Sequence, residues 1–157
     1  MNLRSLAVLA MAPIVISGCA GTGSTSTRSA AADAVVIPLQ ATRINAGRVG
    51  RATLLPLDGK TSIVLDFTGV PGDTTRPVHV YTYVYEASCD ALTTRPAYAF
   101  NERVLAAKPA GGLGPFQIAH TASVPMSDLL SGRFSIALRS APQDGDRVIY
   151  CGELRRA

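Results

Sequence analysis

Between Val78 and Tyr85 the sequence alternates between two kinds of side chain, and this alternation constrains the fold more than any other feature. Successive side chains of a β-strand point to opposite faces, so a period of two predicts a half-buried strand. One face would carry Val78, Val80, Thr82 and Val84, and the other His79, Tyr81, Tyr83 and Tyr85. Since no segment shows sustained helical periodicity, the sequence predicts a chain built mainly of strands.

Further short β-compatible segments recur along the chain and are separated by turn signals. Asp58-Gly59 and the run from Pro71 to Asp73 mark two of these turns. Residues 125–130 are compatible with a single helical turn between strands. Such spacing predicts an all-β, antiparallel sandwich or barrel of seven or eight strands. Besides Val78–Tyr85, the expected strands are residues 52–57, 61–67, 117–124, 133–139 and 147–154.

The N-terminal region differs in composition and predicts export. A positively charged start, Met1–Arg4, precedes an apolar stretch, Leu6–Ile16, that is too short to span a bilayer. The four residues Ile16–Cys19 then resemble the bacterial lipobox position by position: aliphatic, small, small, cysteine. We therefore expect residues 1–18 to be a lipoprotein signal peptide. The alternative is an ordinary signal peptide, in which Cys19 is incidental.

Lipidation at Cys19 would determine where the protein works. The thiol would carry a diacylglycerol as a thioether, and each buried methylene contributes about 0.8 kcal/mol to anchoring. Ala20 stands where an Asp retains enteric lipoproteins at the inner membrane, so the resemblance implies a lipid anchor in the outer membrane, facing either the periplasm or the cell surface. Residues 19–33 combine the lipidated cysteine with a flexible linker rich in Gly, Ser, Thr and Ala. The β-sandwich domain would occupy residues 34–157.

Charge and motifs exclude several classes of function. Lys and Arg outnumber Asp and Glu by 15 to 11, but no basic run is longer than Arg155-Arg156. Nucleic-acid-binding proteins normally carry a clustered basic footprint, so no nucleic acid is expected as a partner. The Gly111–Gly114 segment lacks the Lys and Ser/Thr of a phosphate-binding loop, and no Gly-x-Ser-x-Gly elbow occurs. The sequence therefore predicts a protein that is not an enzyme and carries no cofactor.

With Cys19 assigned to lipid, Cys89 and Cys151 remain as an even pair. Exported proteins rarely keep two free thiols in an oxidising compartment, so we expect a disulfide between them. A redox-active pair is the alternative, although no Cys-x-x-Cys spacing supports it. A disulfide would pin the loop after the tyrosine-rich strand onto the last strand.

Three segments together resemble one known family. Pro77–Tyr81 is similar to the His-x-His strand that carries copper ligands in the copper/zinc superoxide dismutases. Cys89 and the run Tyr150–Gly152 are similar to the cysteine and the Cys-Gly that form the disulfide of that family. Residues 129–136 are similar to its Leu-x-x-Gly-x-Ser-Ile segment. The resemblance spans residues 53–154 and implies a Greek-key sandwich, immunoglobulin-like or superoxide-dismutase-like, with one disulfide.

The same comparison argues against dismutase chemistry. The second copper ligand of the family falls on Tyr81, or in an alternative register both ligands fall on Tyr83 and Tyr85. The family's site needs several histidines and an aspartate, whereas this chain contains only His79 and His120. These two side chains are the remaining candidates for a copper or zinc site, since imidazole suits both metals. Alternatively, each histidine is satisfied by a hydrogen bond within the fold, and no metal is bound.

Tyr81, Tyr83 and Tyr85 form the best-defined candidate binding surface. Tyr supplies a large contact area and a hydroxyl at low entropic cost, which suits a sugar, a peptide or a partner protein. Alternatively, the three residues simply favour an extended chain.

The chain as a whole is expected to be a noncatalytic, membrane-anchored envelope lipoprotein that presents a binding or structural surface. It resembles small lipoproteins of Gram-negative bacteria, including Burkholderia-type organisms, some of which are surface antigens. A periplasmic copper- or zinc-binding relative of the dismutases is the second hypothesis. An enzyme of unrecognised type is the third.

Overall fold

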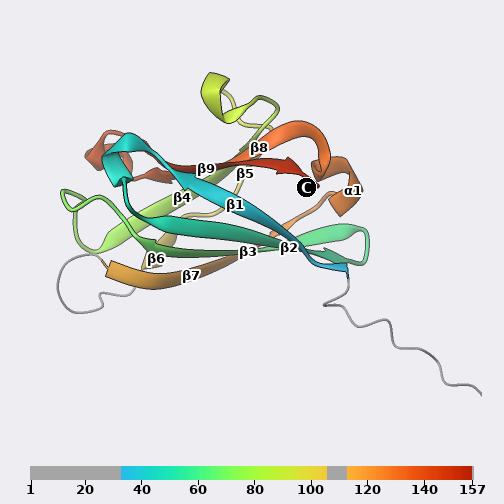
Figure 1. The fold of residues 1–157 in the computed structure, drawn as a ribbon, viewed down its shortest axis with the longest axis horizontal. Helices are drawn as coiled ribbons and strands as arrows, with labels where there is room; N and C mark the ends of the chain where they lie inside the picture. Colours follow the sequence, from blue (N-terminus) through green and yellow to red (C-terminus); the bar gives the residue numbers. More distant parts are fainter. Residues whose placement is uncertain (1–32, 106–112, 157) are drawn as a thin grey trace, which may run out of the picture.

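Nine β-strands and a few short helical turns make up the part of the chain that the computed structural model describes, residues 33–105 and 113–156 (Figure 1). The strands are β1 (Val35–Ala41), β2 (Val49–Leu57), β3 (Lys60–Gly69), β4 (Val78–Tyr85), β5 (Tyr98–Ala99), β6 (Arg103–Leu105), β7 (Leu113–Ala122), β8 (Ser131–Ser140) and β9 (Val148–Arg155). The helical elements are η2 (Arg43–Asn45), η3 (Cys89–Ala91), α1 (Met126–Leu129) and η4 (Pro142–Asp144).

The strands form one antiparallel sheet that curves into a nearly closed, barrel-like sandwich. Its order is β5-β4-β8-β9-β1-β2-β3-β7, and β6 pairs with β4 beside β5. In Figure 1, β4, β8 and β9 lie in the upper layer, and β2, β3 and β7 lie in the lower one. The strand β1 joins the layers by pairing with both β9 and β2. The predicted all-β, antiparallel class is confirmed; the described strands number nine, two of them no longer than three residues.

The core follows from the alternation of side chains along the strands. In β4 the predicted inner face is confirmed, with Val78, Val80 and Val84 buried among the core side chains. Phe67 of β3 is also buried, and its ring lies 5.6 Å from that of Tyr150. The largest fully buried side chains are Tyr150, Phe67, Leu54, Ile63, Leu65, Leu129, Ile136, Leu138, Ile149, Leu154, Val70 and Val78. Each large aliphatic side chain among them stabilises the fold by roughly 1.5–3 kcal/mol.

The two layers meet closely where β1 pairs with β9. The ladder contains only the pairs Gln40–Cys151 and Ala41–Tyr150. Pro38 has no N–H to donate, so the ladder cannot extend along β1 by another hydrogen-bonded pair. A Cβ at Gly152 would lie only 2.7 Å from the carbonyl oxygen of Pro38. Glycine at position 152 therefore allows the two strands to approach.

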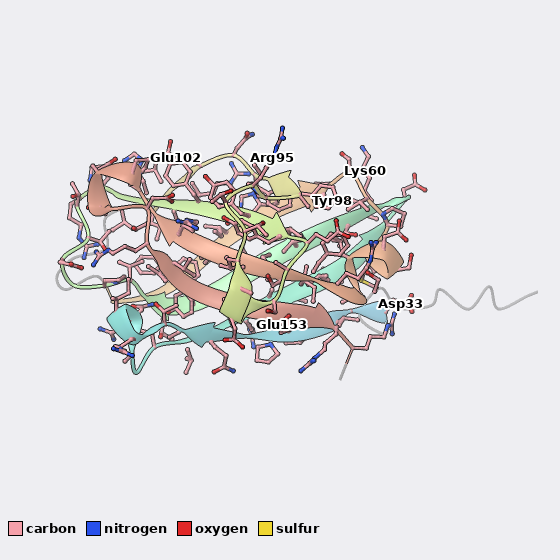
Figure 2. All side chains as sticks on the ribbon, turned by 90° about the horizontal axis from the view of Figure 1, so that it is seen from above. Asp33, Lys60, Arg95, Tyr98, Glu102 and Glu153 are labelled. Atoms are coloured by element: carbon pink, nitrogen blue, oxygen red, sulfur yellow. A yellow bond between two sulfur atoms is a disulfide. The ribbon has the colours of Figure 1, made fainter. Side chains whose placement is uncertain are left out.

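The predicted disulfide between Cys89 and Cys151 is confirmed, with 5.8 Å between the two Cα atoms. It holds η3 against the outer surface of the upper layer, where Figure 2 shows this segment beside Glu153. The backbone N–H of Cys89 donates a hydrogen bond of 2.8 Å to the Glu153 carboxylate. Residues 86–97 thus cover part of the sheet, and they bury the outward-facing side chains of Tyr85 and Ala137.

The β8–β9 hairpin is held from the side by polar contacts. Asp144 accepts hydrogen bonds from the backbone N–H and the hydroxyl of Thr75, at 3.0 and 2.5 Å. Arg147 makes two parallel hydrogen bonds of 3.0 Å to the carboxylate of Asp73. These contacts fix the hairpin against the loop that precedes β4.

The predicted signal peptide at residues 1–18, the lipidated Cys19 and most of the linker at 19–33 lie outside the described residues. Within the described ranges, no helix is long and apolar enough to cross a membrane.

Candidate binding surface

The outward-facing side chains of β4 include all three tyrosines of the predicted surface. Tyr81 and Tyr83 are half-buried, whereas Tyr85 is only 3% exposed because residues 86–97 lie over it. The accessible part of the surface is therefore smaller than the sequence suggested. Tyr81 and Tyr83 remain reachable from solvent, and Tyr85 forms the floor of the region beside them.

A pocket on this face, which we call the tyrosine groove, lies between β4 and the segment that follows it. The rings of Tyr83 and Tyr85 are 6.1 Å apart and tilted by 58°. One wall comes from the covering segment and the other from β8 and the β8–β9 hairpin. The groove is lined by Tyr83, Tyr85, Leu92, Thr93, Thr94, Pro96, Arg139 and Asp146. Polar groups on rigid strands and aromatic rings therefore meet in one concave site.

Arg139 and Asp146 form the charged wall of the groove. The guanidinium donates from Nε to Asp146 Oδ1 at 2.8 Å and from Nη2 to Oδ2 at 3.0 Å. Nη1 also donates to the hydroxyl of Tyr85 at 3.4 Å. Burial works against the charge on Arg139, but the contacts with Asp146 and Tyr85 outweigh it and raise the pKa of the guanidinium. The two charges thus neutralise each other within the wall.

The backbone of the hairpin positions this carboxylate. Asp146 has a φ of 47°, in the left-handed region that Asp tolerates better than most residues. Its conformation aims the side chain back across the hairpin toward Arg139, the register partner of Tyr81 on β8.

A second polar cluster lies on the same face of β4. His79 Nδ1 forms a hydrogen bond with Glu102, which lowers the pKa of that carboxyl. Hydrogen bonding to Glu102 also raises the pKa of Tyr81. The pKa of Tyr83 is raised by burial and by the negative charge of Asp146. Both phenols therefore stay protonated at neutral pH and keep a hydroxyl that can donate and accept.

The two candidate metal ligands lie on opposite faces of the sheet. His79 points outward from β4, beside Glu102. His120 of β7 is 6% exposed and points into the core, where its Nε2 forms a 3.1 Å hydrogen bond with the Thr82 hydroxyl. Its ring stacks on Phe100 with 4.8 Å between ring centroids. The histidines therefore do not face a common site, and the described residues contain no cluster of three or more metal-ligating side chains.

Burial sets the ionisation of His120. Desolvation, with a smaller contribution from the charge of Arg103, lowers the pKa of the imidazole to about 4. The side chain is thus neutral at physiological pH, in keeping with a histidine held by a hydrogen bond inside the fold.

The outer face of the lower layer, which we call the open face, is chemically different. It carries the outward-facing side chains of β1, β2, β3 and β7. One row across it consists of the register partners Val36, Thr53, Val64 and Ala119. Val36 is 58% exposed. The next row contains an ion pair between Arg51 and Asp66 at 3.2 Å.

Sequence reasoning missed several groups of the tyrosine groove. Arg139 ends an apolar run in a predicted strand, and pairing that strand with Val78–Tyr85 would have brought it to the tyrosines. Asp146 follows Gly145 between two predicted strands. Gly and Asp are typical turn residues, so this pair could have placed the Asp146 side chain at the tip of a hairpin. No local pattern points to Thr94, because only the path of the covering segment brings it to this face. Glu102 of the neighbouring cluster is likewise placed by long-range pairing, since it directly precedes β6, which pairs with β4.

No protein-family profile matches the sequence, and no curated protein or solved structure is significantly similar to this chain. The resemblance to the superoxide dismutases therefore stays a prediction.

Proposed function

We propose that this chain is a noncatalytic lipoprotein of the bacterial outer membrane, anchored through Cys19, whose domain uses the tyrosine groove to bind a component of the envelope. The observation that carries the binding role is the groove itself, in which aromatic rings and paired charges are held by a disulfide and by a double hydrogen bond. The anchoring role rests on the lipobox-like run that ends at Cys19.

The chemistry of the groove supports binding over catalysis. A general acid or base needs a proton-transfer group that is free to reach its substrate. Arg139 and Asp146 are instead engaged with each other, and the phenol of Tyr83 keeps its proton at neutral pH because burial and the charge of Asp146 raise its pKa. Pre-ordered aromatic and hydroxyl groups are suited to recognition, because little conformational entropy is lost when a ligand binds.

The topology supports the finer proposal of a Greek-key sandwich of the superoxide-dismutase kind. In a Greek key, three consecutive strands are neighbours and the fourth returns to lie beside the first. Here β4 pairs with β6, and β8 returns to pair with β4. Arg103 of β6 donates a 3.0 Å hydrogen bond to the Ala119 carbonyl, which brings β7 beside β6. An experimental structure in which β7 does not lie beside β6 would contradict the Greek key.

The anchoring part is tested by expressing the full chain and its Cys19→Ser variant in a Gram-negative host fed with labelled palmitate. We expect label and outer-membrane fractionation for the unchanged chain, and the loss of both for Cys19→Ser. Equal labelling of the two chains would contradict lipidation at this residue.

The binding part is tested by adding the full chain to envelope fragments and measuring how much is retained. We expect Tyr83→Ala to reduce retention, whereas Thr121→Val, an exposed change on the open face, leaves it unchanged. Equal retention of Tyr83→Ala and the unchanged chain would remove the tyrosine groove from the proposal.

A further inference from the structure

Strand β4, which carries Tyr83 and Tyr85 of the tyrosine groove, is paired along both of its edges. On one side, β4 pairs with β8 from Val80 to Tyr85. On the other side it pairs with β6 and β5, and the gap between them is closed by a bond from the Phe100 N–H to the Thr82 carbonyl at 3.0 Å. Peptides that bind by strand addition need an unpaired edge. A ligand in this groove therefore cannot bind as an added strand of β4, which leaves the side chains that line the groove as its main partners.

The side chains available to a ligand carry almost no net charge. The positive charge of Arg139 is matched by Asp146 at two contacts, so neither attracts a free ion strongly. The phenol of Tyr83 and the hydroxyls of Thr93 and Thr94 add neutral groups that both donate and accept hydrogen bonds. A strongly ionic ligand would find no uncompensated partner among the groups that line the groove.

The groove also offers aromatic and apolar surface next to these neutral polar groups. The ring of Tyr83 together with Leu92 and Pro96 offers apolar contact beside the hydroxyls, and the largely buried Tyr85 supports it from below. A sugar ring has C–H faces that pack on aromatic and apolar groups and a rim of hydroxyls that donate and accept. A charged peptide or a fatty chain matches only part of this lining.

We infer that the tyrosine groove binds an uncharged saccharide chain. This inference rests on the proposed function and names the class of envelope component that the groove takes. The ring of Tyr83 would pack against a sugar face, and the hydroxyl of Thr94 would hydrogen-bond to the sugar rim. The ligand chemistry is shared by the glycan strands of the cell wall and by lipid-borne saccharides of the outer membrane.

The test is a titration of the full chain with a neutral tetramer of β-1,4-linked N-acetylglucosamine, followed by tyrosine fluorescence. The chain has no Trp and five Tyr, so the signal of the groove is not masked by indole emission. We expect a saturable change in fluorescence. Tyr83→Ala should weaken binding about tenfold, through loss of the ring contact. Thr94→Val should weaken it about threefold, because one hydrogen bond is lost.

Matched variants separate the groove from general effects on the fold. Thr121→Val makes the same chemical change as Thr94→Val, but on the open face, and should bind normally. Tyr98→Phe changes a tyrosine that does not line the groove and should also bind normally, because the Tyr98 ring packs against Phe134 of the core, with 6.1 Å between ring centroids. Circular dichroism and free-thiol counting verify that each variant is folded and holds its disulfide.

Parallel arms with purified cell-wall glycan strands and with a neutral polysaccharide released from the lipid part of lipopolysaccharide identify the source. Binding in either arm that requires Tyr83 supports the inference. An absence of response to all three saccharides would overturn it, and so would a response that Tyr83→Ala leaves intact. If envelope fragments retain the chain in a Tyr83-dependent way but the captured component is a protein, the saccharide inference fails while the proposed function stands.

Discussion

The two outer faces of the sheet differ in what lies over them. On the upper layer, residues 86–97 cover part of the outward-facing surface of β4, β8 and β9, so that Tyr85 is as buried as a core residue. On the open face, the outward side chains of β1, β2 and β7 remain largely exposed, and Val36 is an example. The strands of both layers alternate inward and outward side chains. The outward side chains are solvated on the open face, whereas on the upper layer some of them form a second apolar cluster and a groove. The difference comes from residues 86–97, which cover part of the upper layer, and from the Cys89–Cys151 disulfide that holds them there.

The largest effect on stability is expected from removal of the Cys89–Cys151 disulfide. Replacing both Cys89 and Cys151 with Ala releases a sequence separation of 62 residues, which should lower the free energy of unfolding by about 4 kcal/mol in the chain-entropy model. Urea unfolding measures this loss. Hydrogen exchange should then rise first in residues 86–97, while β2 and β3 stay protected. Uniform loss of protection across both faces would show that the covering segment is not a separate unit.

Truncation of matched outward-facing residues sharpens the comparison next. Tyr85→Ala removes a buried ring and should destabilise the fold by about 3 kcal/mol, as in a core. Val36→Ala on the open face should change stability by less than about 0.5 kcal/mol. Both values come from urea denaturation of the full chain. Similar costs for the two variants would contradict the contrast between the faces.

The stability of the fold should depend on pH through His120, which is buried between the two layers. The folded protein holds the pKa of this imidazole at about 4, whereas the unfolded chain has the ordinary value of 6.5. Between these values only the unfolded chain binds the proton, so stability should fall as pH decreases through the window. One such group contributes a slope of up to about 1.4 kcal/mol per pH unit.

Urea unfolding between pH 6.5 and 5 checks this slope before most carboxyl groups titrate. His120→Gln keeps a polar group near Thr82 and lacks the titrating imidazole, so its stability should be nearly flat over the same range. An equal slope in His120→Gln would assign the pH dependence to other groups.

The smallest effect concerns the ion pairs of the two faces. Arg51 on the open face is 63% exposed, so a double-mutant cycle with Asp66 should give a coupling of only about 0.2–1 kcal/mol. Arg139 is 21% exposed and forms two bonds with Asp146, so its coupling should be the larger of the two. The order of the two couplings is the test, and a stronger Arg51–Asp66 coupling would reverse it.

Local sequence patterns predicted the strands well but not what covers them. Val78–Tyr85 was expected with its bounds and its buried face, because the period of two along one strand is a local property. The strand expected at residues 117–124 lies at Leu113–Ala122, and its inner face passes through His120, which a polarity pattern assigns to the surface. Burial of this side chain depends on Thr82 and Phe100 from other parts of the chain.

The candidate site was predictable only in part for the same reason. The tyrosines and the disulfide were visible as residue types and spacings. Burial of Tyr85 and the arrival of Arg139 and Asp146 depend on the path of residues 86–97 and on the register of β4 with β8. Such long-range placement follows from packing of the whole sheet, for which a single stretch of sequence carries no signal.

The position of β9 has a consequence for how the protein is made. This strand comes after all the others in the chain, yet it lies between β8 and β1 and contains Cys151. During synthesis, the earlier strands emerge before the strand that joins the two layers, and Cys89 is made before its disulfide partner. The sheet and its cover are thus completed in one late event, so a chain interrupted before Val148 would present open strand edges and a free thiol to the quality-control proteases it meets.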